Sequence, residues 1–229
     1  MKSPRLLVAA LGIFSVVCHA ADDKKPVGPP VVKRMKAAIS TPLFIQQAAG
    51  LSTLAEVTLT ATATPTKPDA PGIVAFVPPL GSSGKAVLDS VSKYLVERHH
   101  GWPAGQRIEI VFTPPIAPDD TAAAGLATAT VLDSMFGDWE ADAKCAVVGH
   151  LQADGKIVSV SGALMRLLTA MRAGSSRILM PEKNVAEAAT DVMINEGPAA
   201  FGRVQMFAVK DLDEIPMMAG TKPENTVAE

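Results

Sequence analysis

The sequence predicts a single domain of mixed strands and helices, of α/β or α+β class. Short alternating or wholly apolar segments, typical of strands, interleave with segments whose apolar residues recur at helical spacing. Of the 229 residues, 48% are hydrophobic but only 4% are aromatic, which favours small aliphatic contacts between helices and a sheet. A chain of this length is sufficient for one substantial core.

The first twenty residues have the pattern of a secretory signal peptide. A basic start is followed by an apolar run from Leu6 to Val17 and by a small-x-small ending at Ala20. We therefore expect residues 1–20 to be removed and the protein to be secreted or periplasmic. Acylation at Cys18, as in a lipoprotein, is an open alternative.

We expect residues 21–54 to form a flexible N-terminal arm. Residues 21–31 are charged and proline-rich, which is typical of mobile termini. The next twenty residues have mixed character and fit a short helix or an extended arm equally well.

The domain that we assign to residues 55–216 opens with two strands. Residues 56–64 alternate strictly, which predicts a half-buried strand, and residues 72–77 are wholly apolar. The following helix ends at Gly101, and its apolar positions are Val87, Leu88, Val91, Tyr94 and Leu95. Residues 107–113 then form another strand.

An alanine-rich helix, "DDTAAAGLATAT", begins the second half of the domain. We expect Asp119 or Asp120 to cap it and Gly137 to end it. Strands at 144–149 and 155–160 come next, joined by a turn.

The last part of the domain alternates helices and strands. A helix over 161–174 carries apolar residues at Leu164, Leu167, Leu168 and Met171. A strand at 177–180, a helix at 184–195 and a strand at 204–209 follow. We expect the tail, 217–229, to be disordered.

Several functional classes lack support in the sequence. A net charge of −2 and a pI near 6.1 argue against a nucleic-acid surface. The "GSSGK" stretch has Ala86 where a phosphate loop needs Ser or Thr, so we expect no ATP-binding module. His99, His100 and His150 lack the spacing of metal ligands. We expect neither a metal nor a cofactor, and Cys145 is expected in a buried strand.

From Arg107 to Val209, the order of elements resembles the proteolytic domain of Lon-type ATP-dependent serine peptidases. The most specific stretch is "GKIVSVSGALMRLLTAMRAGSSRILMPEKN", residues 155–184. It is similar to the family's glycine-bounded strand, the helix that bears its catalytic lysine, and an apolar strand ending in proline and asparagine. The resemblance implies a Lon-like fold, with helices packed on a mixed sheet.

The resemblance places the family's Ser–Lys dyad on two substituted positions. Its serine falls on Ala123 and its lysine on Arg166, and the 43-residue separation agrees with the family's spacing. The threonine that supports the dyad falls on Val148. The cleft-lining positions that the resemblance implies are Asp120, Gly125, Val148, Gly149 and Gly162.

These substitutions predict a catalytically inactive domain. A methyl group cannot attack a carbonyl, and a base must lose its proton before it can accept one, which arginine does not do in proteins. An active serine endopeptidase with displaced catalytic groups is the alternative, with Thr121, Thr128, Ser159 and Ser161 as the hydroxyls nearby. Arg166 itself fits either a solvated side chain or a ligand for a peptide carbonyl or carboxylate.

The resemblance also implies partners. Lon-type clefts bind extended peptides, so a silent domain could hold a peptide or an unfolded protein segment as a binding, scaffold or regulatory module. Lon-type domains assemble as rings, which implies a homo-oligomer. ATP-driven unfolding would need a separate subunit.

Overall fold

The computed structural model describes residues 31–47, 50–195 and 197–221. The expected signal peptide, and with it the cleavage site, lies outside the described residues. So do the first part of the expected arm and the last part of the expected tail.

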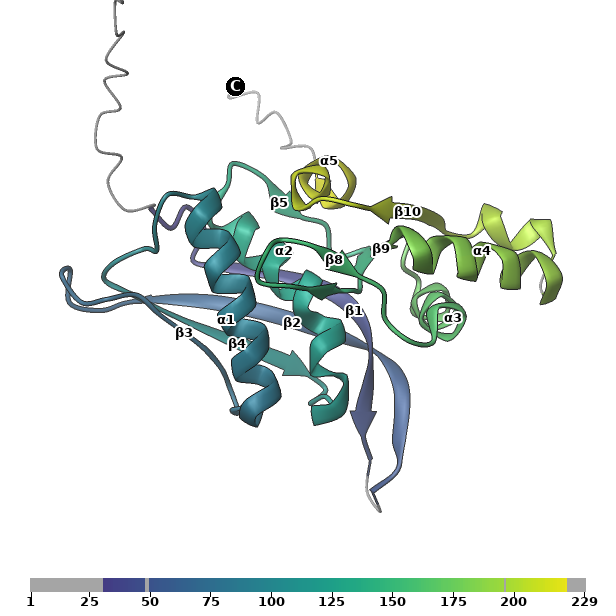
Figure 1. Ribbon diagram of the computed structural model, residues 1–229, viewed down its shortest axis with the longest axis horizontal. Coiled ribbons are helices and arrows are strands. Elements are labelled where there is room, and N and C mark those ends of the chain that lie inside the picture. Colours follow the sequence, from purple (N-terminus) through teal and green to yellow (C-terminus); the bar gives the residue numbers. More distant parts are fainter. Residues whose placement is uncertain (1–30, 48–49, 196, 222–229) are drawn as a thin grey trace, which may run out of the picture.

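A seven-stranded mixed sheet forms the framework, in the order β10-β9-β6-β1-β2-β4-β3 (Figure 1). Its strands are β1 (Lys36–Gln46), β2 (Ser52–Pro65), β3 (Ile73–Phe76), β4 (Gln106–Thr113), β6 (Cys145–Val147), β9 (Arg177–Pro181) and β10 (Gln205–Val209). The β1–β2 and β2–β4 pairs are antiparallel, and the other pairs are parallel. The predicted fold class, a single domain with helices on a mixed sheet, is confirmed.

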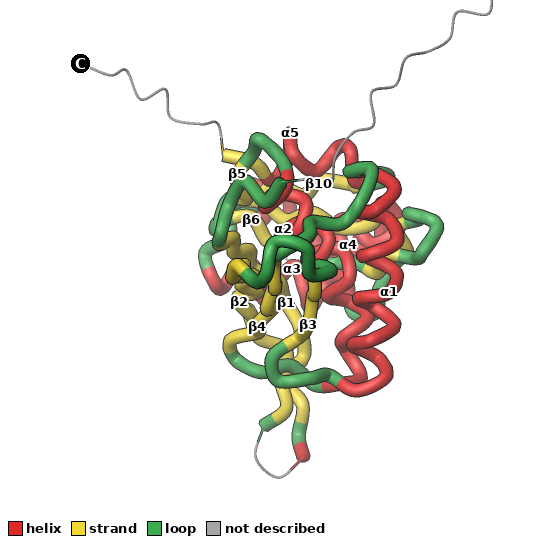
Figure 2. Tube along the Cα trace, turned by 90° about the vertical axis from the view of Figure 1, so that its left-hand side faces the viewer, coloured by secondary structure: helices red, strands yellow, loops and turns green. Residues whose placement is uncertain are grey.

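Helices and two small ribbons complete the fold. The α-helices are α1 (Gly81–Arg98), α2 (Gly125–Phe136), α3 (Ala163–Ala173), α4 (Glu182–Asn195) and α5 (Ile215–Ala219). The 3₁₀ helices are η2 (Pro118–Ala124), η3 (Pro198–Gly202) and η4 (Leu212–Glu214). One small ribbon pairs β5 (Glu140–Ala141) with β11 (Gly220–Thr221), and the other pairs β7 (His150–Leu151) with β8 (Ile157–Val158). Figure 2 shows the helices and the strands gathered in separate layers. None of the described helices has the length and apolar character needed to cross a membrane.

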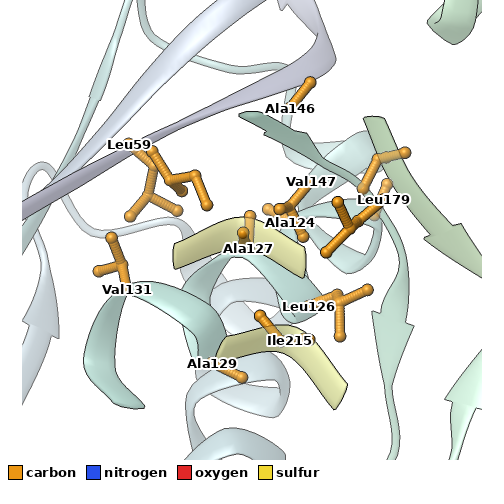
Figure 3. Close-up of a cluster of buried hydrophobic side chains, with 14 of the residues drawn as sticks. Leu59, Ala124, Leu126, Ala127, Ala129, Val131, Ala146, Val147, Leu179 and Ile215 are labelled. Carbon is orange, nitrogen blue, oxygen red and sulfur yellow. The ribbon is translucent and has the colours of Figure 1, made fainter. Parts of the chain in front are cut away.

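Helix α2 lies in the centre of the core, with every residue buried. Small side chains such as Ala127 and Ala129, which Figure 3 labels, let it approach the sheet closely. Its hydroxyl groups are hydrogen-bonded within the helix: Thr128 donates to the Ala124 carbonyl and Thr130 to the Leu126 carbonyl, both at 2.8 Å. The quoted alanine-rich stretch therefore serves close packing.

The expected flexible arm is wrong for residues 52–54, which begin β2, and for residues 36–46, which form the central strand β1. It pairs with β2 along its whole length and with β6 at Ser40. The sequence pattern did not identify this strand, because Ser40, Thr41 and Pro42 interrupt its apolar residues. Pro42 is tolerated because β6 pairs with β1 at Ser40 and not at Pro42.

The expected disordered tail is wrong for residues 217–221. This segment ends α5 and forms β11, which pairs with β5. Ile215 and Ala219 anchor it, with 1% and 0% of their surface exposed. The sequence pattern was too short to reveal a five-residue helix that is stabilised by tertiary packing.

Candidate functional site

The segment before α2 differs from the single capped helix that the sequence predicts. Residues Pro118–Ala124 form the 3₁₀ helix η2, and no side chain caps either η2 or α2. The Oδ2 atom of Asp120 instead accepts a hydrogen bond from the Phe44 backbone amide at 2.8 Å. The predicted capping role of Asp119 or Asp120 is therefore wrong, because a partner on β1 takes the Asp120 carboxylate.

Arg166 is the largest fully buried side chain of the chain's described part, with 1% of its surface exposed. Its Nη2 donates to Oδ1 of Asp120 at 2.6 Å, and its Nη1 donates to Oδ2 at 2.9 Å. Nη1 also donates to the Pro42 carbonyl at 2.7 Å, and Nε to the Ser161 carbonyl at 2.9 Å. The guanidinium carbon lies 5.4 Å from the centre of the Phe44 ring.

These contacts decide between the two expectations for Arg166. The solvated side chain is wrong, since Arg166 lies on the buried face of α3 together with Leu167, and residues of η2 and β1 bind its guanidinium. Four of its five N–H groups have partners inside the protein, which leaves one for a ligand. Arg166 therefore joins η2, β1 and the start of α3.

Ala123 lies on the same side of η2 as Asp120. A 3₁₀ helix has three residues per turn, so the side chains at 120 and 123 are eclipsed. Ala123 has 4% of its surface exposed, and its carbonyl accepts the Gly149 amide at 3.0 Å. The methyl group of Ala123 therefore lies on the side of η2 that the Asp120–Arg166 pair occupies.

Two glycines allow the start of α2 to pack against the segment after β6. The Leu126 amide donates to the Gly149 carbonyl at 2.9 Å. A Cβ at Gly125 would lie 3.0 Å from the Leu151 nitrogen, and one at Gly149 would lie 3.0 Å from Cδ2 of Leu126. Neighbouring Val148 is fully buried, with its amide bonded to the Leu179 carbonyl.

The segment before α3 is held by Asn184, a residue to which sequence reasoning gave no role. Its Oδ1 accepts the Val160 amide and its Nδ2 donates to the Val160 carbonyl, both at 2.8 Å. Gly162 then begins α3 with φ +72°, a left-handed conformation that favours glycine. This arrangement aims the Ser161 carbonyl at Arg166. The asparagine in "MPEKN", which belongs to the stretch that resembles the family, was the sequence signal that could have pointed to this role.

Sequence reasoning also missed Pro42 and Phe44, because β1 was assigned to the arm. Among the residues that it named, Asp120 and Arg166 are in direct contact, and Gly125 and Gly149 lie at one junction. Two of the four nearby hydroxyls are engaged elsewhere: Thr121 donates to the Pro118 carbonyl at 2.7 Å, and Thr128 donates to the Ala124 carbonyl.

Other reactive groups do not extend this site. Burial raises the pKa of the Cys145 thiol to about 12, so the thiolate is scarce at neutral pH. Among the described residues, no group of three or more His, Cys, Asp or Glu side chains could hold a metal ion.

The comparisons with known proteins agree on one family. A model of the Lon protease (S16) C-terminal proteolytic domain matches residues 92–219. The Lon protease of Trichlorobacter lovleyi is 27% identical over 149 residues, which cover 61% of this chain and 18% of the relative.

Two further relatives match shorter stretches. The Lon protease of Clostridium beijerinckii is 29% identical over 99 residues (43% of this chain, 12% of the relative), and the peroxisomal Lon protease homolog 2 of Zea mays is 28% identical over 109 residues (47% and 12%). The chain thus spans less than a fifth of the length of these relatives.

Proposed function

Since the chain belongs to the family of Lon protease C-terminal proteolytic domains, we propose that it is a member without peptidase activity that acts as a peptide-binding or scaffold module. The observation that carries the proposal is the engagement of four of the five Arg166 N–H groups by Asp120, Pro42 and Ser161. At the position that we assign to the catalytic lysine, the side chain supports the fold.

The chemistry of the two substituted positions supports this proposal. A Ser–Lys dyad needs a hydroxyl that attacks and an amine that is neutral. Ala123 supplies a methyl group. Arginine keeps its proton in proteins, so Arg166 does not supply the neutral base that the dyad needs.

Displaced catalytic groups receive less support. Thr121 and Thr128 are buried, and each hydroxyl donates to a backbone carbonyl. Neither has a lysine or histidine among its hydrogen-bond partners within the described residues. A peptidase that used either threonine would therefore need a rearrangement of η2 or of α2.

The proposed location, ligands and self-association of this module are based on the sequence. Residues 1–20 support export followed by cleavage after Ala20. Peptides or unfolded protein segments are the proposed ligands, and self-association is proposed from the family resemblance.

Proteolysis assays test the proposal directly. The purified protein, incubated with unfolded casein and with a fluorophosphonate probe, should give no time-dependent cleavage and no covalent label. An active Lon protease serves as the positive control. Labelling of the unmodified chain would overturn the proposal and favour displaced catalytic groups.

A further inference from the structure

A groove separate from Arg166 runs between the edge strand β3 and helix α1. Its volume is about 570 Å³, which is in the range of small-ligand sites. Figures 1 and 2 both show α1 beside β3. Its apolar lining includes Val74, Phe76, Leu80, Leu88, Val96 and Trp102.

One wall of the groove is a strand edge with free backbone groups. Among the described residues, β3 pairs with β4 alone, and the Val77 amide donates to the Ile110 carbonyl at 2.8 Å. Backbone groups alternate in direction along a strand, so those of Val74 and Phe76 point away from β4. They are available to a further strand, and an extended peptide is the ligand that such an edge recognises.

The charges on α1 give the peptide a direction. Lys85 is exposed and lines the groove near the end at which α1 begins, where the first turn has no acidic residue. This end therefore attracts a carboxylate. Asp89 also lines the groove, one turn further along. Four helical residues rise about 6 Å, which corresponds to about two residues of an extended strand.

We propose that the groove binds the C-terminal end of an extended peptide, which adds to β3 as a strand. The peptide's terminal carboxylate lies beside Lys85, and its apolar last side chain enters the groove. A basic side chain two positions earlier faces Asp89, since alternate residues of a strand share one face. Because β3 runs toward the start of α1, the peptide runs parallel to it.

The inference rests on the peptide-binding part of the proposed function and places that binding away from Arg166. It is independent of whether the chain cleaves peptides, because the groove shares no residue with the Asp120–Arg166 pair. The casein assay can therefore contradict the proposed loss of peptidase activity while the peptide still binds in the groove. Peptide binding can likewise fail while the chain proves inactive toward casein.

Fluorescence anisotropy with a labelled octapeptide ending in Lys-Ala-Val tests the assignment. The free acid should bind saturably, and the same peptide as a C-terminal amide should bind at least about tenfold more weakly. Lys85→Glu should weaken the binding of the free acid by a similar factor. Lys93→Glu is the matched control, since Lys93 is exposed on α1 but does not line the groove. It should leave the affinity unchanged.

A backbone variant tests strand addition. Val74→Pro removes an amide that points to the open edge, where proline is tolerated. It should weaken peptide binding while the melting temperature stays within a few degrees.

Three results would overturn the proposal: no binding of the free acid, equal affinity for acid and amide, or a loss of affinity in Lys93→Glu that equals the loss in Lys85→Glu. Sedimentation provides a further arm. Self-association that Lys85→Glu or Val74→Pro abolishes would assign the edge to a second copy of the chain and would also overturn the proposal.

Discussion

The guanidinium of Arg166 and the carboxylate of Asp120 make two parallel hydrogen bonds inside the protein, with Nη2–Oδ1 at 2.6 Å and Nη1–Oδ2 at 2.9 Å. The two residues come from α3 and η2 and are separated by 46 positions. The same carboxylate accepts the Phe44 amide, and the same guanidinium binds the Pro42 carbonyl. The pair thus holds the central strand and both flanking segments in one arrangement.

Removing one partner of this pair should destabilise the protein. Arg166→Met leaves the Asp120 charge largely buried and unpaired, which typically costs about 3–5 kcal/mol. In a domain of this size, we expect the melting temperature to fall by on the order of 10 °C. Calorimetry or circular dichroism measures the change.

The matched control for this prediction is Arg172→Met, on the same helix but exposed, which should leave the melting temperature nearly unchanged. The double variant Asp120→Leu with Arg166→Met removes both charges and should be more stable than Arg166→Met alone. A single variant as stable as the parent protein would show that the pair contributes little to the fold.

Restoring the dyad chemistry requires both substitutions together. Ala123→Ser alone should remain unlabelled by a fluorophosphonate, because the charged guanidinium cannot accept the serine proton. In Ala123→Ser with Arg166→Lys, we expect weak labelling that increases from pH 7 to pH 9. The reason is that a lysine beside Asp120 is held in its charged form near neutral pH. Labelling of Ala123→Ser alone would contradict the role that we give to Arg166.

Helical and strand periodicity predicts most elements between residues 55 and 216, because each such pattern is local. The family resemblance also selects Asp120 and Arg166. The bonds of Arg166 could not be predicted, since its contact with Pro42 spans 124 positions. The angular position of Arg166 on α3 suggested solvent, but η2 and β1 cover that side. A helical pattern says which face is apolar and does not say what tertiary partners cover the other face.

Asn184 should be needed for the geometry of the segment before α3. Asn184→Leu removes both hydrogen bonds to Val160 and leaves its backbone amide and carbonyl without partners, which costs about 1–3 kcal/mol. The matched control is Asn195→Leu, on the same helix but exposed. Hydrogen exchange of the Val160 amide measures the effect. If protection there is the same in Asn184→Leu as in the parent protein, the proposed support is absent.

The pH dependence of stability should reveal the ionisation of Glu56, whose side chain is partly buried on β2. Burial raises the pKa of its carboxyl group, and hydrogen bonds from Ser40 and Ser175 only partly oppose this rise. Its Oε2 atom is buried without a partner among the described residues. Because the pKa is higher in the folded state than in the unfolded state, the folded state binds the proton more tightly. The stability that Glu56 contributes is therefore present below its unfolded pKa, near ~4.3, and is lost as the pH rises through its folded pKa.

Glu56→Gln removes this ionisation while an amide oxygen can still accept from Ser175. We expect its melting temperature to exceed that of the parent protein at pH 7, and the difference to shrink as the pH falls toward 4. Thermal unfolding of both proteins across this range measures the difference, which isolates Glu56 from the carboxylates whose pKa is lowered, such as Asp142. Glu97→Gln, an exposed change on α1, controls for the loss of one negative charge. If the melting temperature of Glu56→Gln exceeds that of the parent protein by more at low pH than at pH 7, the folded protein stabilises the ionised form of Glu56. That result would contradict the raised pKa.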